Sequence, residues 1–331
     1  MTLGMAMLGC AADVRGCDAQ AIDADPALPS QRVPIDRPLW TGVRCIDTLL
    51  TIGRGARVGI FGEPGCGKST LLETIVRGTH ADAVVVGLVG ERGREAQSWL
   101  ERIDARTSIV CATGDRPAEE RIAAASLAMS QACALATRGL HVLLVLDSLA
   151  RVAYALREEG VARGESVGRA GYPPSVFAHL ARLVERAGAF HSGSVTMLAT
   201  VLSDGDDRDP VSEAARSLLD GHLQLSGALA QAGRFPAIDV LASTSRTMHA
   251  VVTPEHRAAA SRVRAALAAL ASSADARSLG LEPADERTQA AVAAESQIER
   301  LLRQGPVQIS PPAALEALAQ TADMCGVDHG F

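Results

Sequence analysis

Aromatic residues, clusters of basic residues and long apolar runs are scarce or absent in this chain of 331 residues. Aromatics make up 3% of the sequence, which leaves few stacking platforms for single-stranded nucleic acid. No block of Lys or Arg exceeds a pair, and the net charge of −6 argues against nucleic acid as the main partner. No run reaches the roughly 18 apolar residues that a membrane span needs. These absences disfavour a nucleic-acid-binding module and a membrane-spanning protein.

The cysteines lack the spacing of a metal site or of a redox pair. There are seven of them, widely dispersed, without a CxxC motif or a Cys/His ligand spacing. This pattern favours a reducing cytosol over a disulfide scaffold or a zinc site. With 47% hydrophobic residues the chain can bury a sizeable core, and its length predicts one large α/β domain with a smaller appendage.

One motif is specific enough to indicate chemistry. It fits the G-x-x-x-x-G-K-[ST] phosphate loop (Walker A), after an apolar strand predicted over 57–61 and before a helix predicted over 71–77. Lys68 would reach the β- and γ-phosphates, and the Ser69 hydroxyl would ligate Mg²⁺. A chance glycine-rich turn is the alternative. We expect nucleotide phosphates to bind along the whole loop, which consists of Gly62, Glu63, Pro64, Gly65, Cys66, Gly67, Lys68, Ser69 and Thr70.

Strands and helices alternate beyond this loop, which is typical of a mostly parallel sheet covered on both faces. After Pro254 the pattern becomes helical, with breaks near 280–283 and 305–312. We predict strands over 83–89, 107–112, 141–147 and 194–202, and helices over 95–104, 117–137 and 175–187. The predicted domains are a linker or disordered tail over 1–38, an α/β nucleotide-binding domain over 39–253 and a helical C-terminal domain over 254–331.

Two acidic residues follow predicted strands and are candidates for the chemistry of hydrolysis. Asp147 ends an apolar strand, where parallel strands present ligands, and could hold Mg²⁺. The alternative for Asp147 is a helix cap, a role that Ser148 could share. Glu91 stands at the tip of another strand, where a carboxylate could orient water toward the γ-phosphate. The alternative for the segment 90–95 is a solvated charged turn.

Six motifs stand in order along the chain, at 42–72, 90–95, 146–158, 171–177, 219–222 and 235–246. Their residues and order resemble the ATPases of bacterial type III secretion systems, a family that includes the injectisome and flagellar export enzymes and is related to the catalytic subunits of rotary ATP synthases. The resemblance covers about 33–250 closely and the C-terminal part loosely. It implies a RecA-like phosphate-loop core with a mostly parallel sheet and a small C-terminal helical domain, with ATP and Mg²⁺ as cofactors.

The resemblance also implies roles for charged residues near the phosphate loop. Glu91 is expected to be the catalytic glutamate that activates water, and Arg92 to contact the γ-phosphate region. Glu95 matches a partner carboxylate nearby. Arg151 matches the basic residue four positions past Asp147, the expected Mg²⁺ ligand.

Two further residues match family positions outside that cluster. Phe235 falls where the family places an aromatic against adenine, with a core aromatic as the alternative. Arg246 matches the arginine that reaches into the neighbouring subunit's site as an arginine finger. The chain departs from the family at Gly227, where a basic residue is usual, and at Leu301, where a Phe is usual and a thinner adenine pocket is expected. The family's N-terminal β-barrel also lies outside this sequence, which puts ring assembly in question.

The function implied is ATP hydrolysis that energises type III protein secretion, with release of chaperones and unfolding of exported substrates. Expected partners are further copies in a homohexamer, export-apparatus proteins, stalk and stator subunits, and secretion chaperones with their cargo, but no nucleic acid. The expected place is the cytoplasm, peripheral to the bacterial inner membrane. Three alternatives stay open: a flagellar export ATPase, a RecA-like hexameric nucleic-acid translocase, and a non-catalytic paralogue that only binds nucleotide.

Overall fold

A computed structural model describes residues 25–101, 104–202, 209–281, 283 and 285–326. Within them the centre is an eight-stranded sheet in the order β10-β9-β3-β8-β6-β4-β5, with β7 paired to β8. A smaller sheet pairs β1 with β2. The strands are β1 (Pro38–Leu39), β2 (Ile52–Gly53), β3 (Arg57–Gly62), β4 (Ala83–Val89), β5 (Thr107–Ala112), β6 (His141–Asp147), β7 (Gly188–Ala189), β8 (Ser194–Leu202), β9 (Gly221–Leu225) and β10 (Ile238–Ser245).

The large sheet is mostly parallel, because β3, β8, β6, β4, β5 and β9 all pair in parallel while β10 and β7 pair antiparallel with their neighbours. Its central strands are continuous apolar runs, and every residue of β6 is buried. Such runs are typical of strands covered by helices on both faces. The predicted α/β class is confirmed.

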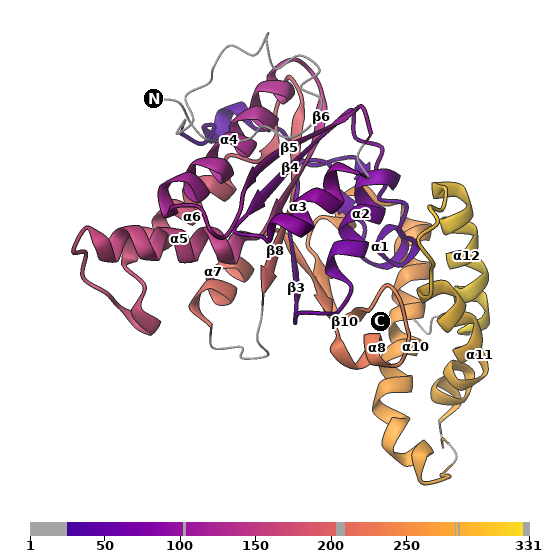
Figure 1. Ribbon diagram of the computed structural model, residues 1–331. Coiled ribbons are helices and arrows are strands. Elements are labelled where there is room, and N and C mark those ends of the chain that lie inside the picture. The colour runs from indigo at the N-terminus through magenta and orange to yellow at the C-terminus, as the bar shows by residue number, and fades with distance from the viewer. Residues whose placement is uncertain (1–24, 102–103, 203–208, 282, 284, 327–331) are drawn as a thin grey trace.

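Helices form a layer on each face of this sheet (Figure 1). The side chains of β4 show the division: Val84 and Val86 belong to one apolar core with Leu72, whereas Val85 belongs to the other core with Ala124. This alternation follows from the two-residue period of a strand. The first layer holds α1 (Arg44–Leu49), α2 (Lys68–Gly78) and α3 (Gly93–Leu100), and the second holds α4 (Ala118–Thr137), α5 (Leu149–Ala162), α6 (Pro174–Glu185) and α7 (Pro210–Leu218).

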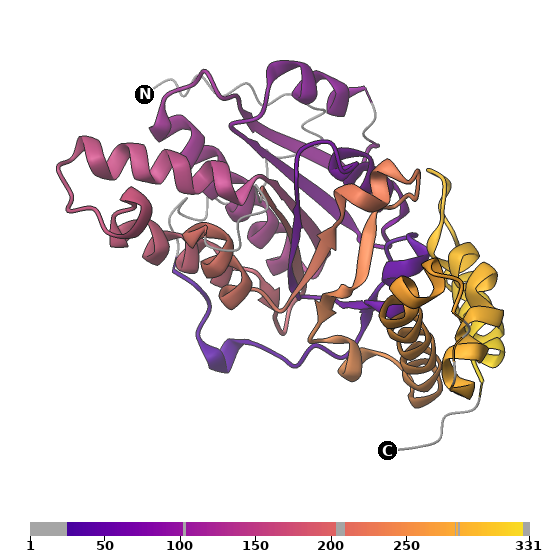
Figure 2. The ribbon, with the colours of Figure 1, turned by 90° about the horizontal axis from the view of Figure 1, so that it is seen from below.

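Three C-terminal helices stand beside α1, on the side of α2 (Figures 1 and 2). Thr253 begins the first of them, since its side chain accepts a hydrogen bond from the backbone N–H of His256 at 3.2 Å. Ile298 and Leu318 belong to the same apolar core as Leu72 of α2, so these helices share a core with the α/β part. They are α10 (Pro254–Ser278), α11 (Glu286–Leu302) and α12 (Pro311–Met324), and the short helices are η2 (Pro29–Gln31), η3 (Arg169–Gly171), α8 (Gly227–Gln231) and α9 (Met248–Val251).

The expected disordered tail falls in part on residues 1–24, outside the described residues. From Asp25 onward the chain follows the surface of the α/β part. Val33 donates its backbone N–H to the Ala189 carbonyl at 3.1 Å, and Arg32 forms an ion pair with Glu185 at 3.4 Å. The stretch around Arg32 is therefore attached to the domain rather than a free linker. In the described part of the chain, we find no helix with the length and apolar character needed to cross a membrane.

Candidate active site

The phosphate loop joins the end of β3 to the start of α2. Gly65 and Gly67 have φ values of 89° and 82°, the left-handed conformation that glycine adopts without strain. Gly67 is the N-cap of α2, so the free N–H groups of the first helical turn face the loop. Ser69 is exposed, and the Cys66 side chain is buried beneath the loop. The loop thus presents backbone donors and the positive end of a helix dipole to solvent, which suits a phosphate group.

Lys68 and Asp147 face each other between the carboxyl ends of β3 and β6, the two strands that flank β8. The Lys68 Nζ lies 3.4 Å from Asp147 Oδ1, which also accepts a hydrogen bond from the Thr200 hydroxyl at 2.5 Å. Lys68 is the only lysine in the sequence. Ser148 is the N-cap of α5 and accepts from the Arg151 N–H, so helix capping falls to Ser148 and the Asp147 carboxylate is left to Lys68 and Thr200.

Glu91 follows β4 and is 8% exposed, so the alternative of a solvated turn is wrong for this residue. Its Oε1 atom is buried and has no hydrogen-bond partner in the described structure. Burial, followed by the nearby Asp147 charge, raises the pKa of the Glu91 carboxyl to about 7, against the opposing charge of Lys68. A buried carboxylate with an unused oxygen beside a phosphate loop has the chemistry of a water-orienting group.

The other charged residues predicted near this cluster differ in burial. Arg92 and Glu95 are exposed, at the start of α3. Arg151 on α5 is half-buried, and its Nε has no partner in the described structure. Its side chain lies against Gly90, where an added Cβ would come within 3.0 Å of Arg151 Cβ. Arg151 thus borders the turn that carries Glu91, whereas Arg92 and Glu95 face solvent.

A mainly apolar pocket of about 400 Å³ adjoins the phosphate loop. Phe235 lies at its edge, 47% exposed, so the alternative of a core aromatic is wrong. An added Cβ on Gly67 would lie 3.4 Å from the Phe235 ring, which places the ring against the loop. Ten residues line the pocket, namely Val43, Gly67, Thr70, Leu71, Thr74, Phe235, Pro236, Gln304, Gly305 and Pro306.

One expectation about this end of the site changes. Leu301 is 2% exposed, lies in the apolar core and is not among the pocket residues, so the prediction that it thins the pocket is wrong. The C-terminal wall comes instead from Gln304 and its neighbours, just beyond the end of α11. Gly227 lies beside the phosphate loop, where its added Cβ would be 3.3 Å from Glu63 Oε2.

The residues present fit Mg²⁺ bound together with a nucleotide. Mg²⁺ in nucleotide sites takes one or two protein oxygens and completes its shell with phosphates and water. Asp147 supplies a carboxylate near Lys68, and Ser69 supplies an exposed hydroxyl on the phosphate loop. Among the described residues no group of three or more His, Cys, Asp or Glu side chains could hold a metal ion. The donor set therefore suits a shared, phosphate-bound cation rather than a resident metal.

Arg246 lies near the amino ends of the parallel strands β9 and β3, whereas the phosphate loop follows the carboxyl end of β3. It follows β10, whose last residue, Ser245, pairs with Gly221, and Gly221 pairs with Val58 at the start of β3. The phosphate loop follows the other end of β3, about 15–20 Å away along the strand. The Arg246 side chain is exposed, so it cannot reach the Lys68 of its own chain but is accessible to another molecule.

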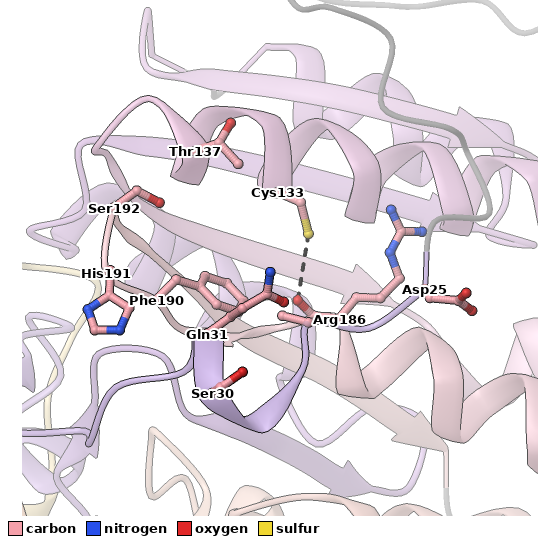
Figure 3. A pocket seen from close by; sticks show the side chains of 10 residues that line it. Asp25, Ser30, Gln31, Cys133, Thr137, Arg186, Phe190, His191 and Ser192 are labelled. Atoms are coloured by element: carbon pink, nitrogen blue, oxygen red, sulfur yellow. Dashed lines mark hydrogen bonds between the residues drawn. The ribbon is translucent and has the colours of Figure 1, made fainter.

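A second pocket, of about 530 Å³, also lies away from the phosphate loop. Figure 3 shows it between Cys133 of α4, Arg186 and Gln31, with Asp25 at its margin. The Cys133 thiol donates to the Arg186 carbonyl at 3.6 Å there. None of the predicted site residues lines it, so the larger cavity is not the candidate active site.

The fold and the site together define a phosphate-loop nucleotide-binding protein. Residues 42–245 match the model of the ATP synthase alpha/beta family, nucleotide-binding domain. The chain belongs to that family and lies among its type III secretion and flagellar members.

Two curated relatives show this placement. The chain is 49% identical over 258 residues to a type 3 secretion system ATPase of Pseudomonas syringae pv. tomato, over 76% of this chain and 58% of that protein. It is 43% identical to a flagellum-specific ATP synthase of Salmonella typhimurium, over 92% of this chain and 72% of that protein. The chain thus spans just over half of the first relative's length.

Two solved structures share the fold. The assembled ATPase EscN from the type III secretion system of enteropathogenic E. coli matches with a TM-score of 0.89 and 40% identity, over 92% of this chain and 76% of that one. EscN in complex with its central stalk EscO matches with a TM-score of 0.86 and 39% identity, over 92% of this chain and 75% of that one.

Proposed function

We propose that this protein hydrolyses ATP. The observation that carries the proposal is that Lys68 at the start of α2, Asp147 at the end of β6 and Glu91 just after β4 interact, with a buried Glu91 oxygen left unpartnered. In this proposal Lys68 and the N-terminus of α2 bind the β- and γ-phosphates, while Ser69 and Asp147 hold Mg²⁺. The cation, when bound, would neutralise charge on the phosphate oxygens.

The reaction is the attack of water on the γ-phosphorus, which forms a P–O bond and breaks the bond to the β-phosphate oxygen. We assign to Glu91 the orientation of this water and the acceptance of its proton, and the products are ADP and phosphate. We assign Arg92 and Arg151 to charge stabilisation around the γ-phosphate, with Glu95 as a nearby partner carboxylate. The apolar pocket beside Phe235 would take the adenine, because an aromatic ring can stack on it.

We infer that ATP hydrolysis by this protein energises type III secretion, with release of chaperones and unfolding of cargo at the cytosolic side of the inner membrane. The names of the relatives support this inference, and the assembled EscN and its stalk complex support a homo-oligomer that binds a stalk. Stator subunits, export-apparatus proteins and chaperones are proposed on the family resemblance alone. Arg246, exposed at the far sheet edge, supports a site completed by a neighbouring copy, as in a hexamer.

A flagellar export role is the second candidate, favoured by the relative from Salmonella typhimurium that matches 92% of this chain. One experiment separates the two. The gene is deleted in its own bacterium, and both flagellar assembly and secretion of non-flagellar proteins are measured. We expect secretion to stop and motility to persist, with wild type but not Glu91→Gln restoring secretion. Loss of motility alone would assign the flagellar role.

The biochemical test uses the purified chain. We expect release of phosphate from ATP that requires Mg²⁺ and stops when EDTA is added. Absence of turnover together with retained ATP binding, over a wide range of protein concentrations, would favour the non-catalytic paralogue.

A further inference from the structure

The walls of the apolar pocket come from parts of the chain that are far apart in sequence. Val43 precedes α1, Phe235 and Pro236 follow α8, and residues 304–306 follow α11. Only Gly67, Thr70, Leu71 and Thr74 belong to the phosphate loop and α2. Hydrogen bonds between these distant walls would set their spacing around the pocket.

Gln304 makes that connection through its backbone and its side chain. Its backbone N–H donates to the Phe235 carbonyl at 2.8 Å. Its side-chain Oε1 accepts from the Arg44 N–H at 2.7 Å, and its Nε2 donates to the carbonyls of Gly42 and Val307, each at 2.7 Å. Gln304 thus belongs to one distant wall and bonds to the segments that carry the other two.

These contacts leave the Gln304 amide with both N–H donors occupied and one acceptor position engaged. It therefore has no free donor with which to recognise the edge of a base. The contacts instead fix the distance between Val43 on one side of the pocket and Phe235 on the other.

The segment that Gln304 holds is itself well anchored. The Asp47 carboxylate, 0% exposed, accepts hydrogen bonds from the backbone N–H and hydroxyl of Thr41 and from the Gly42 N–H, at 2.7–2.9 Å. The Arg44 guanidinium donates to the carbonyls of Arg300, Leu301 and Arg303 at the end of α11, at 2.6–2.9 Å. These contacts fasten the end of α11 to the first residue of α1.

We propose that Gln304 is a positioning residue of the nucleotide site, which joins the three distant walls of the pocket and thereby sets the affinity for the base but not for the phosphates. Arg44 supports it from outside the pocket. The inference rests on the proposed nucleotide binding and extends it to residues that contact neither phosphate nor metal.

Calorimetric titration of the purified full chain with MgATP and with magnesium tripolyphosphate tests the proposal. Tripolyphosphate has the phosphates and lacks the base. In Gln304→Ala we expect the affinity for ATP to fall about tenfold, the range expected when partly buried hydrogen bonds are lost, and that for tripolyphosphate to stay unchanged. Arg44→Ala should show the same pattern with a smaller fall, because it acts only through the held segment.

The matched control is Gln320→Ala, the same chemical change at an exposed position of α12, where the Gln320 amide donates a hydrogen bond to Glu316. It should leave both affinities unchanged. Unchanged tripolyphosphate binding also shows that each variant is folded. If Gln304→Ala does not fold, the same two titrations are made with Gln304→Glu. This variant keeps the acceptor for Arg44 and removes both side-chain donors.

Three results would overturn the positioning role: unchanged ATP affinity in Gln304→Ala, equal losses for ATP and tripolyphosphate, or an effect confined to Gln304→Ala with Arg44→Ala like wild type. Failure of the wild type to bind either ligand would instead contradict the proposed function.

Discussion

The two ends of the proposed nucleotide site are built in different ways. At the phosphate end, charged residues stand at the carboxyl ends of the parallel strands β3, β6 and β4, and Lys68 Nζ and Asp147 Oδ1 lie 3.4 Å apart. At the base end, the pocket is apolar and its walls come from 43, 235–236 and 304–306, which hydrogen bonds of Gln304 hold together. The phosphate end takes its geometry from parallel strand pairing, and the base end takes it from tertiary contacts between distant segments.

This difference predicts that changes at the two ends of the site affect different quantities, turnover at one end and affinity for ATP at the other. Changes at the phosphate end should affect turnover most, because charge develops there in the transition state. Changes at the base end should affect affinity for ATP and leave turnover at saturation nearly unaltered, since the base is remote from the reacting atoms.

The largest effect is expected for Lys68→Ala, which should abolish measurable turnover and weaken the binding of ATP and tripolyphosphate alike. Because Lys68 is the only lysine, an amine-selective reagent should modify one side chain in wild type, and ATP should protect it. Phosphate release and mass spectrometry measure the two effects. Normal turnover in this variant would exclude the phosphate-loop assignment.

Arg246→Ala should lower turnover by roughly 10³–10⁵, the effect of removing an arginine finger, and keep nucleotide affinity. Mixing it with the inactive Lys68→Ala protein should restore part of the activity, because some junctions then pair an intact Lys68 with an intact Arg246. Specific activity should also rise with protein concentration. Flat specific activity on dilution, with no rescue on mixing, would make Arg246 an ordinary intrasubunit residue.

Glu91→Gln should reduce turnover by roughly 10²–10⁴ and bind MgATP about as tightly as wild type, because only the water-orienting step is lost. Single-turnover kinetics and calorimetry on one preparation give both quantities. A parallel loss of binding would reassign Glu91 to a structural role.

Phe235→Ala should weaken ATP about tenfold through lost stacking while leaving tripolyphosphate affinity and saturated turnover close to wild type. Phe235→Tyr keeps the ring and serves as the control. If saturated turnover fell with affinity, the two ends of the site would not be separable.

The smallest effect concerns pH. Since the pKa of Glu91 is raised to about 7 and its ionised form is the active one, kcat/KM should fall about threefold between pH 7.5 and 6.5 at saturating Mg²⁺. The residues lining the base end include no titratable side chain to add to this fall. The residual kcat/KM of Glu91→Gln should not fall over this pH range. A wild-type kcat/KM that does not change with pH would contradict the role of Glu91 as base.

The same difference decided how much of the site the sequence could predict. Short local patterns locate Lys68, Glu91 and Asp147, because each follows an apolar strand and parallel strands bring such ends together. The prediction for Leu301 failed because burial within α11 depends on its packing against the core, which no local pattern gives. The wall residue Gln304 lies beyond the helix end, and its partners Gly42 and Phe235 are too far away in sequence to be recognised.

The fold was predictable for similar reasons. The central strands β3, β4, β5, β6 and β8 lie within one residue of the predicted ranges, since both of their faces are buried. β9 and β10 were not predicted. β10 is the edge strand and β9 is next to it. Burial alternates along β9 and the register of β10 shifts between Asp239 and Thr244, so neither forms a continuous apolar run. The domain boundaries and the roles of the site residues stay predictions.

Arg246 lies at the end of the strands that is opposite the phosphate loop, and this position sets how many complete sites an assembly would contain. Each copy would carry two half-sites facing opposite ways, and a lone copy would possess no whole one. An open row of n copies then contains n − 1 whole sites, whereas closing the row into a ring adds the last. ATP turnover per copy would therefore rise with the number of neighbours in contact. Closing a row into a ring would increase the turnover per copy without any change in the chemistry of a single site.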